Sequence, residues 1–449
     1  MLECVFFGGA GDHQHGELGG VQLLMNDLDL ETKVMVDCGQ RPDHYNQFIN
    51  FPYSPKRFQA LDIAKMFKFY PNLAGLFRSD LDNYGQNGQT KIPLDAIILT
   101  HAHYDHAGGL PLIRPDLPVW MHPLAKKILY WWQETSGRTV NQFVDVYEQS
   151  LIPDVAGGER FSQGRIAKVS RDIRLFEKGK PFKVRNMDIT HYLTDHSLPG
   201  SGGFCLETSV GNIGISGDIR LRGRRRADTE NFVNQLLKKD LSYLFWEGSL
   251  LHFDHEGTED DVTQNVYELI KDRGFAAIAY PPRDFDRILS CYKAAKKDDR
   301  MLVVSPAQAL MLKSLDGENG YPRLNWKHIG VYLHRKNKGL LDKEDYSDQL
   351  IQRDYAKWER QFLKCARWDQ HQSKPQRVSI DDLASHQDKF LTFMPANYMM
   401  DMLTEISKKT GGKIKNGIYI RSHPAPWTPE MEIQEQLQIN ILNHFGMYD

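Results

Sequence analysis

The segment Leu99-Thr-His-Ala-His-Tyr-Asp-His-Ala-Gly-Gly109 carries four side chains that can bind a metal ion within six residues. Residues 95–99 precede the histidines as an apolar run, which is typical of a buried strand. His101 and His103 are two residues apart, so in an extended segment their side chains point to the same side. Imidazole and carboxylate groups without a thiolate suit a catalytic zinc site better than a structural one. The segment therefore predicts a metal centre at the end of a buried strand.

Two later segments carry further side chains of this kind. His196 lies in the glycine-containing segment 195–203, and Asp218 follows the apolar run 213–216. A lone histidine or aspartate at a strand end is more often only hydrogen-bonded, so neither residue is informative alone. The first segment has an alternative as a histidine-rich surface loop, but a buried strand leads into it and two glycines lead out. We therefore expect the three segments to form one site.

The length and composition favour a globular protein of two or three domains, since 449 residues exceed one ordinary core. The formal net charge is -2, so a polyanion would have to be bound by local patches or by metal ions. The five cysteines contain no CxxC pair, which argues against a disulfide framework and favours a reducing cytoplasm. We find no signal peptide and no apolar stretch of the ~20 residues that a membrane helix needs. We expect a cytoplasmic protein without a membrane segment.

The two halves of the chain differ in their pattern. The first half has short apolar runs between glycine and polar loops, which predicts a sheet sandwich covered by helices. The second half alternates strands and helices, which predicts a parallel α/β domain. We place the boundary at the basic stretch near residues 222–228, and we expect the charged residues 335–377 to form an exposed helical insertion.

This sequence resembles the metallo-β-lactamase superfamily in the order of its motifs. These are an HxHxDH segment, a later histidine and a Gly-Asp pair at a strand end. The resemblance implies two zinc ions, one bound by His101, His103 and His196, the other by Asp105 and His106, with Asp218 between them. Val36-Asp-Cys-Gly39 is similar to the first motif of that superfamily. By this resemblance Asp37 orients the ligands from behind, and Asp105 also accepts a proton in catalysis.

Further segments resemble the ribonuclease J-like group, whose second domain is called β-CASP. These segments are 16–20, 195–201, 217–225, 245–249, 257–262, 281–288 and 418–427. The resemblance implies a zinc-dependent hydrolase that cleaves phosphodiester bonds of single-stranded RNA, with Glu247 helping to protonate the leaving oxygen. The implied fold is α/β: a metallo-β-lactamase αββα sandwich (residues 1–222) with an inserted or appended β-CASP α/β domain (residues 223–449).

The sequence departs from that group at its carboxyl end. We find no HxSGH motif and no later ligand histidine before Asp449. Three explanations are open: the sequence is a fragment, one half of a split protein, or a degenerate relative. A homodimer or a complementing chain could complete the site. His423 lies in a context that is more similar to a substrate-side loop, so we do not assign it to metal.

Substrate contacts are predicted in two places. Arg220, Arg222 and Arg224–Arg226 form a basic run after Asp218 that would contact phosphates, although such runs are often solvated surfaces. Ser305, Arg421 and Ser422 follow predicted strands, where α/β sheets place their ligands. Ordinary loop residues are the alternative for all three.

Two other functions stay open at this point. One is a hydrolase of the same fold that acts on DNA or on a small ester. The other is a non-catalytic RNA-binding protein or partner subunit. The complete set of six ligand-type residues favours an enzyme, and turnover of RNA, DNA and a generic phosphodiester would discriminate between them.

Overall fold

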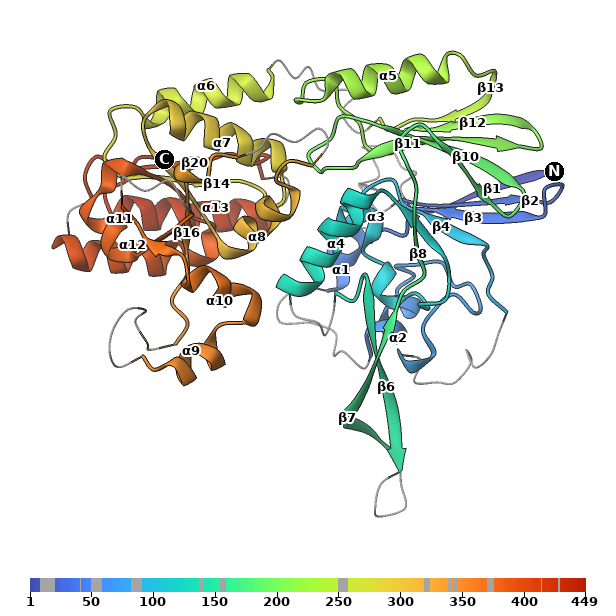
Figure 1. Cartoon of the computed structure of the whole chain (residues 1–449), viewed down its shortest axis with the longest axis horizontal. Helices are drawn as coiled ribbons and strands as arrows, with labels where there is room; N and C mark the ends of the chain where they lie inside the picture. Colours follow the sequence, from blue (N-terminus) through green and yellow to red (C-terminus); the bar gives the residue numbers. More distant parts are fainter. Residues whose placement is uncertain are drawn as a thin grey trace. The chain divides into compact units, whose positions relative to one another are not determined.

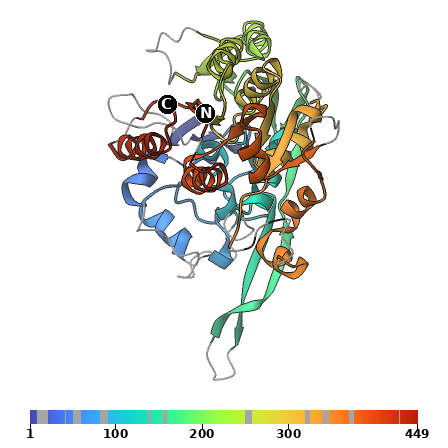
Figure 2. The ribbon, with the colours of Figure 1, turned by 90° about the vertical axis from the view of Figure 1, so that its left-hand side faces the viewer.

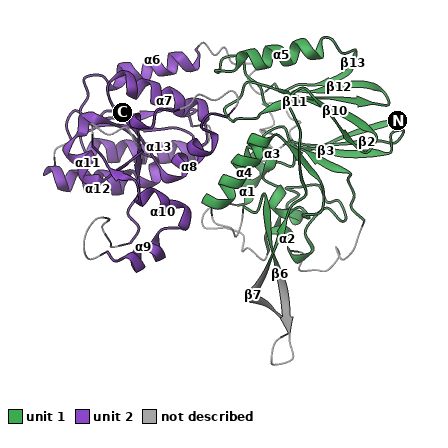
Figure 3. Cartoon of the chain, viewed as in Figure 1, with its two compact units in different colours: residues 1–255 green, residues 256–449 purple. Residues whose placement is uncertain are grey.

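The computed structural model of the chain forms two compact units, Met1–His255 and Glu256–Asp449, which we describe separately (Figures 1 and 3). It describes residues 1–8, 21–40, 42–49, 59–81, 91–136, 141–153, 159–248, 257–318, 324–337, 339, 341, 346–369, 375–412, 414–426 and 429–449. The segment 16–20, which contributed to the resemblance, lies outside these residues.

The first unit contains two large sheets, besides a two-stranded hairpin. The first sheet has the order β1-β2-β3-β4-β5-β8 and consists of β1 (Leu2–Gly8), β2 (Gln22–Asp27), β3 (Thr32–Val36), β4 (Ala96–Ile98), β5 (Val119–Met121) and β8 (Ile173–Leu175). The second has the order β13-β12-β11-β10-β9 and consists of β9 (Pro181–Val184), β10 (Met187–Leu193), β11 (Gly202–Thr208), β12 (Gly211–Ile215) and β13 (Leu241–Phe245). Parallel pairing of β3 with β4, and of β12 with β13, brings the carboxyl ends of these strands side by side.

A single apolar core joins the two sheets. Val34 and Val36 of β3 pack in this core with Phe204 and Leu206 of β11, because alternate residues of a strand face the same side. Met35 faces the opposite side of its sheet and is also buried. Burying each such side chain contributes ~1.5–3 kcal/mol to folding. Strand β3 is therefore buried on both faces, as expected for a central strand with a second layer on each side of its sheet.

Helices cover the outer faces of the two sheets. The first sheet is covered by α1 (Pro42–Phe48), α2 (Ala60–Met66), α3 (Tyr104–Ala107) and α4 (Pro123–Thr135), and the second by α5 (Arg226–Leu236) (Figure 1). Phe232 and Leu236 of α5 pack on Tyr192 and Cys205 of the second sheet. This layering confirms the predicted αββα sandwich.

The first unit extends past Arg222, where the sequence places the domain boundary. The reason is that α5 packs on the second sheet and β13 forms its edge strand beside β12. The sequence patterns also did not indicate the hairpin of β6 (Asp145–Pro153) and β7 (Glu159–Ser170), which extends away from both sheets (Figures 1 and 2).

The second unit contains a seven-stranded, wholly parallel sheet, as the alternating pattern predicts. Its order is β17-β18-β16-β15-β19-β14-β20. The strands are β14 (Ala276–Ala279), β15 (Met301–Val304), β16 (Ile329–Tyr332), β17 (Ala366–Arg367), β18 (Gln376–Val378), β19 (Phe390–Phe393) and β20 (Ile418–Arg421). The helices are α6 (Glu259–Ile270), α7 (Phe285–Lys297), α8 (Pro306–Leu315), α9 (Asp348–Asp354), α10 (Lys357–Leu363), α11 (Ile380–Ser385), α12 (Ala396–Thr410) and α13 (Pro429–His444).

Residues 335–377 are only partly the helical insertion that their charge suggests. They contain the short helices α9 and α10, but also β17 and part of β18, which belong to the sheet. The buried side chain of Gln376 shows why polarity misleads here: a polar residue can be an integral part of a sheet. All five cysteines are unpaired. Among the described residues, no helix is both long and apolar enough to cross a membrane.

Candidate metal centre

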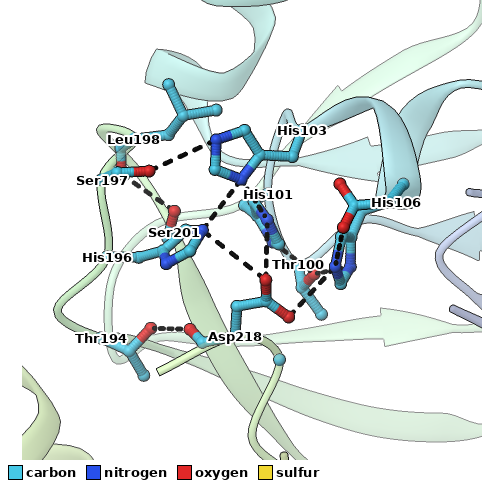
Figure 4. A network of polar contacts seen from close by, with 12 residues as sticks. Thr100, His101, His103, His106, Thr194, His196, Ser197, Leu198, Ser201 and Asp218 are labelled. Carbon is cyan, nitrogen blue, oxygen red and sulfur yellow. Dashed lines mark hydrogen bonds and ion pairs between the residues drawn. The ribbon is translucent and has the colours of Figure 1, made fainter. Parts of the chain in front are cut away.

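The six predicted ligands come from three loops at one end of the sandwich in the first unit. The first loop follows β4 and leads into α3, which carries Asp105 and His106. His196 lies in the loop between β10 and β11, and Asp218 follows β12. The sandwich thus brings together residues that are more than a hundred positions apart in the sequence (Figure 4).

Three imidazole rings and one carboxylate form the first ligand group. The Nδ1 atom of His103 lies 3.0 Å from Nε2 of His101 and 2.9 Å from Nε2 of His196. Asp218 Oδ2 lies 3.7 Å from Nε2 of His101 and 3.7 Å from Nε2 of His196. One atom from each of the four residues therefore converges on a common point.

The second group shares Asp218 with the first. Its Oδ1 atom lies 3.1 Å from Nε2 of His106, and Asp105 Oδ2 lies 3.8 Å from the same nitrogen. Asp105, His106 and Asp218 each offer one atom to this group, and those atoms lie within 4.8 Å of one another. Asp218 thus directs one carboxylate oxygen toward each group, as the motif order implies for a bridging ligand (Figure 4).

This set of donors fits two divalent cations. Ligands ~2.1 Å from a tetrahedral ion lie ~3.4 Å apart, and the contacts of the first group cluster around that spacing. Neutral imidazole nitrogens that face one another cannot all be satisfied by hydrogen bonds among themselves, whereas a cation accepts every lone pair. Imidazole and carboxylate donors without thiolate suit zinc and other divalent transition metals. Burial raises the pKa of the neighbouring Cys38 thiol to about 12, so Cys38 adds no thiolate.

Hydrogen bonds behind the ligands indicate which nitrogen of His101 and of His106 carries a proton. Thr100 Oγ1 donates to Asp37 Oδ2 at 2.7 Å, so it accepts from Nδ1 of His101 at 3.0 Å. His106 Nδ1 donates to Asp37 Oδ2 at 2.8 Å. In His103 it is Nδ1 that faces the ligand group, and Nε2 lies 3.3 Å from Ser197 Oγ. With a proton on Nδ1, His101 and His106 can each direct the Nε2 lone pair toward their ligand group.

Asp37 is held rigidly in place for this task. It is fully buried and has φ 57°, an unusual backbone conformation for a residue other than glycine. Its Oδ1 atom also accepts the Thr100 backbone N–H at 2.7 Å. Since β3 and β4 are parallel neighbours, Asp37 and Thr100 follow adjacent strand ends. The structure thus places Asp37 behind the ligands, where the sequence resemblance puts it.

Burial and close packing shift the pKa values of four of the candidate ligands. Burial, together with His106, holds the pKa of His101 well below its ordinary value, and burial with His103 does the same for His196. Burial would lower the pKa of His106, but Asp218, Asp37 and Asp105 raise it well above its ordinary value. Burial alone would raise the pKa of Asp218, yet His106 and the other histidines hold it well below the usual range.

Sequence reasoning missed two residues of this arrangement, Thr100 and Ser197. Each has a hydroxyl group and adjoins a ligand in the sequence, but nothing in its spacing separates it from an ordinary loop residue. The ring of Tyr104, which lies between His103 and Asp105 in the sequence, is 5.5 Å from that of Trp132 on α4.

The backbone of Glu247 contacts the loop that carries Asp218. It follows β13, and its N–H donates to Ser216 Oγ at 2.8 Å, just before Asp218. Glu247 belongs to neither ligand group. Its predicted part in protonating the leaving oxygen stays a prediction.

Three of the predicted substrate residues, Ser305, Arg421 and Ser422, lie in the second unit. Ser305 caps α8, where its side chain accepts the Gln308 N–H. Arg421 pairs with Glu435 at 3.0 Å and with Asp449. Ser422 Oγ accepts from Arg287 at 2.7 Å. Each of these side chains already has a partner inside the unit, and their contact with substrate stays a prediction.

Comparison with known proteins supports the fold and identifies the superfamily. The sequence profile of the Metallo-beta-lactamase superfamily matches residues 30–266. The chain is 22% identical to Ribonuclease J of Mycoplasma genitalium over 370 residues, which are 77% of this chain and 55% of that protein. It is 21% identical to Ribonuclease J of Mycoplasma pneumoniae over 374 residues, 78% of this chain and 56% of that protein. The chain thus spans about half the length of the curated relatives it matches.

A solved structure shows the same fold over the whole chain. A protein of unknown function from Enterococcus faecalis V583 superimposes with a TM-score of 0.63 at 16% sequence identity. The match covers 100% of this chain and 87% of that one.

Proposed function

The chain belongs to the metallo-beta-lactamase superfamily, and from that premise we propose that it is a two-zinc hydrolase that cleaves phosphodiester bonds of RNA. One observation carries the proposal: Asp218 directs its two carboxylate oxygens into two separate ligand groups. A shared carboxylate between two cation sites suits hydrolysis of phosphate esters, in which the attacking and leaving oxygens both need stabilisation.

The similarity to Ribonuclease J of two Mycoplasma species supports RNA as the substrate. We assign the first unit to a metallo-β-lactamase domain and the second to a β-CASP-like domain. Single-stranded RNA is the proposed partner, and the cytoplasm, which the cysteine usage favours, is the proposed location. A homodimer or a complementing chain stays open.

The chain's own residues would divide the work as follows. When bound, two zinc ions would lower the pKa of water and neutralise negative charge on the phosphate. Asp37 and Thr100 hold the protons of His101 and His106 on the side away from the ligand groups. Asp105 is 30% exposed at its side chain and Asp218 28%, whereas His106 is only 1% exposed. A substrate can therefore reach the carboxylates, while the rings behind them exclude water.

Asp105 is the group placed to accept a proton, because its carboxylate is accessible and faces the centre. Glu247 would return a proton to the leaving oxygen. The Ser216 hydroxyl fixes the Glu247 backbone next to Asp218.

Turnover by purified zinc-loaded protein tests the proposal. Single-stranded RNA, single-stranded DNA of the same sequence and bis(p-nitrophenyl) phosphate are compared, with a His103→Ala variant as the control. RNA cleavage that is lost in the variant supports the proposal. Preferential cleavage of DNA or of the small ester would assign another substrate to this centre. RNA binding without cleavage would point to a non-catalytic protein.

A further inference from the structure

The loop that carries His196 has no regular secondary structure of its own. It connects β10 and β11 through residues 194–201. At its base, Thr194 N–H donates to the Ser201 carbonyl at 3.0 Å, and Ser201 Oγ donates to the Leu198 carbonyl at 2.9 Å. The position of the third imidazole of the first ligand group therefore depends on what holds the tip of this loop.

Arg225 holds that tip. It is the residue before the first turn of α5, and its Nη2 donates to the backbone carbonyl of His196 and, at 3.2 Å, to that of Leu198. The guanidinium group thus binds the peptide of the ligand itself. A planar group with several fixed donors is well suited to hold two carbonyls at once.

Asp195 holds the other side of the loop and is fully buried. Its Oδ1 atom accepts from Arg220 Nε at 3.3 Å and from the Arg225 backbone N–H at 3.3 Å. Its own N–H donates to Thr229 Oγ1 at 2.7 Å, and this hydroxyl donates to the Arg220 carbonyl at 3.1 Å. A Cβ on Gly223 would lie 2.4 Å from the Asp195 carboxylate, so the arrangement leaves no room for a larger residue there.

The same contacts reach the loop that carries Asp218. Arg220 N–H donates to the Asp195 carbonyl at 3.0 Å, and Thr194 Oγ1 donates to the Asp218 carbonyl at 3.3 Å. Two metal-ligand loops, which are separate in the sequence, are thereby joined to each other and to the start of α5.

We infer that Asp195 and Arg225 are positioning residues that fix His196 against Asp218 and so determine the affinity of the first ligand group for its cation. This inference rests on the proposed two-metal function. The arginines of the basic run after Asp218 therefore differ in their surroundings. Arg220 and Arg225 bind groups of the protein, whereas Arg222 and Arg226 are exposed. Of these arginines, the exposed Arg222 and Arg226 would contact RNA phosphates.

The test measures metal affinity at each group separately. Asp105→Asn removes a ligand of the second group only, and His196→Asn removes one of the first group only. Arg225→Met is introduced into both backgrounds, and Co²⁺ is titrated with absorption spectroscopy as the readout. We expect Arg225→Met to weaken binding ~10–100-fold in the Asp105→Asn background and to have no further effect in the His196→Asn background.

Two matched variants complete the design. Arg225→Lys keeps a donor for one carbonyl and should recover part of the affinity. Arg226→Met removes the adjacent arginine, which is exposed and pairs with Glu230 at 2.6 Å, and should bind Co²⁺ as the parent does.

Equal weakening in both backgrounds would show a general loss of folding and overturn the inference. Unchanged Co²⁺ binding with a raised KM for RNA would overturn it as well, since Arg225 would then act on the substrate. If the parent protein binds two ions but cleaves no RNA, the proposed activity fails while this metal-binding test still decides the role of Arg225.

Discussion

Replacement of Asp37 by asparagine should weaken the second ligand group without unfolding the protein. The Asp37 carboxylate accepts three hydrogen bonds, two from Thr100 and one from His106 Nδ1. Asparagine has nearly the same shape, and its oxygen can keep the bond from the Thr100 backbone. Its NH₂ group, however, would then face the N–H of His106 Nδ1. Two hydrogen-bond donors would point at each other, so this hydrogen bond would be lost.

The conflict is relieved when the His106 proton moves to Nε2. That nitrogen faces Asp218 at 3.1 Å and is the one that the second group needs unprotonated. Loss of a partner behind a metal-binding histidine lowers affinity ~10–100-fold. This corresponds to ~1.4–2.7 kcal/mol of binding free energy. Burial raises the pKa of Asp37, so asparagine removes the cost of a buried charge and the metal-free fold should persist.

Zinc titration in competition with a chelator, combined with thermal unfolding of the metal-free protein, measures both effects. Asp188→Asn serves as the control, because this carboxylate pairs with Lys183 on the surface at 2.8 Å. We expect the site of the second group to be weakened in Asp37→Asn and both sites to be unchanged in the control. Two sites of parental affinity in Asp37→Asn would refute the assignment of the His106 proton.

Three other predictions follow from the same contacts. Asp218→Ala removes the carboxylate common to both groups, so zinc content by mass spectrometry should fall below one ion per chain and hydrolysis should drop at least ~100-fold; two retained ions would contradict this. Zinc at ~100 times its dissociation constant should stabilise the protein by ~2.7 kcal/mol per site, and excess EDTA should remove that gain in a melting experiment; identical melting with and without EDTA would argue against tight binding. Burial lowers the pKa of His122 to about 4, so stability that is present above pH ~6.5 is lost as the pH falls toward 4, by up to ~1.4 kcal/mol per pH unit. His122→Asn retains a side chain that can cap α4 and should flatten this slope in urea unfolding at a series of pH values, whereas an unchanged slope would assign it to other groups.

The grouping of the candidate ligands could be predicted from sequence because four of the six lie in one short segment. Four ligand-type residues after a buried strand leave few structural alternatives, and the order of the later motifs identifies His196 and Asp218. The convergence of these residues follows from the sandwich, since loops at one end of two packed sheets lie close together. The buried strands are likewise evident from their short apolar runs, as Val34, Met35 and Val36 show.

The remaining features carry no local signal. The edge strand β13 exposes Tyr243 and Leu244, so its sequence has no alternation of buried and exposed residues. This strand and α5 together extend the first unit beyond the predicted boundary. The inward direction of Arg225 is equally hidden, because its partners are backbone carbonyls, which every residue has. A run of arginines does not reveal which members face the protein.

The central claim is that two cations bind at groups that share Asp218. Anomalous X-ray diffraction at the zinc absorption edge, on crystals grown with zinc, tests it most directly. We predict two peaks, one beside His101, His103 and His196 and one beside Asp105 and His106, with the Asp218 carboxylate between them. Zinc bound elsewhere in the chain, or a single peak that Asp218 does not contact, would contradict the account.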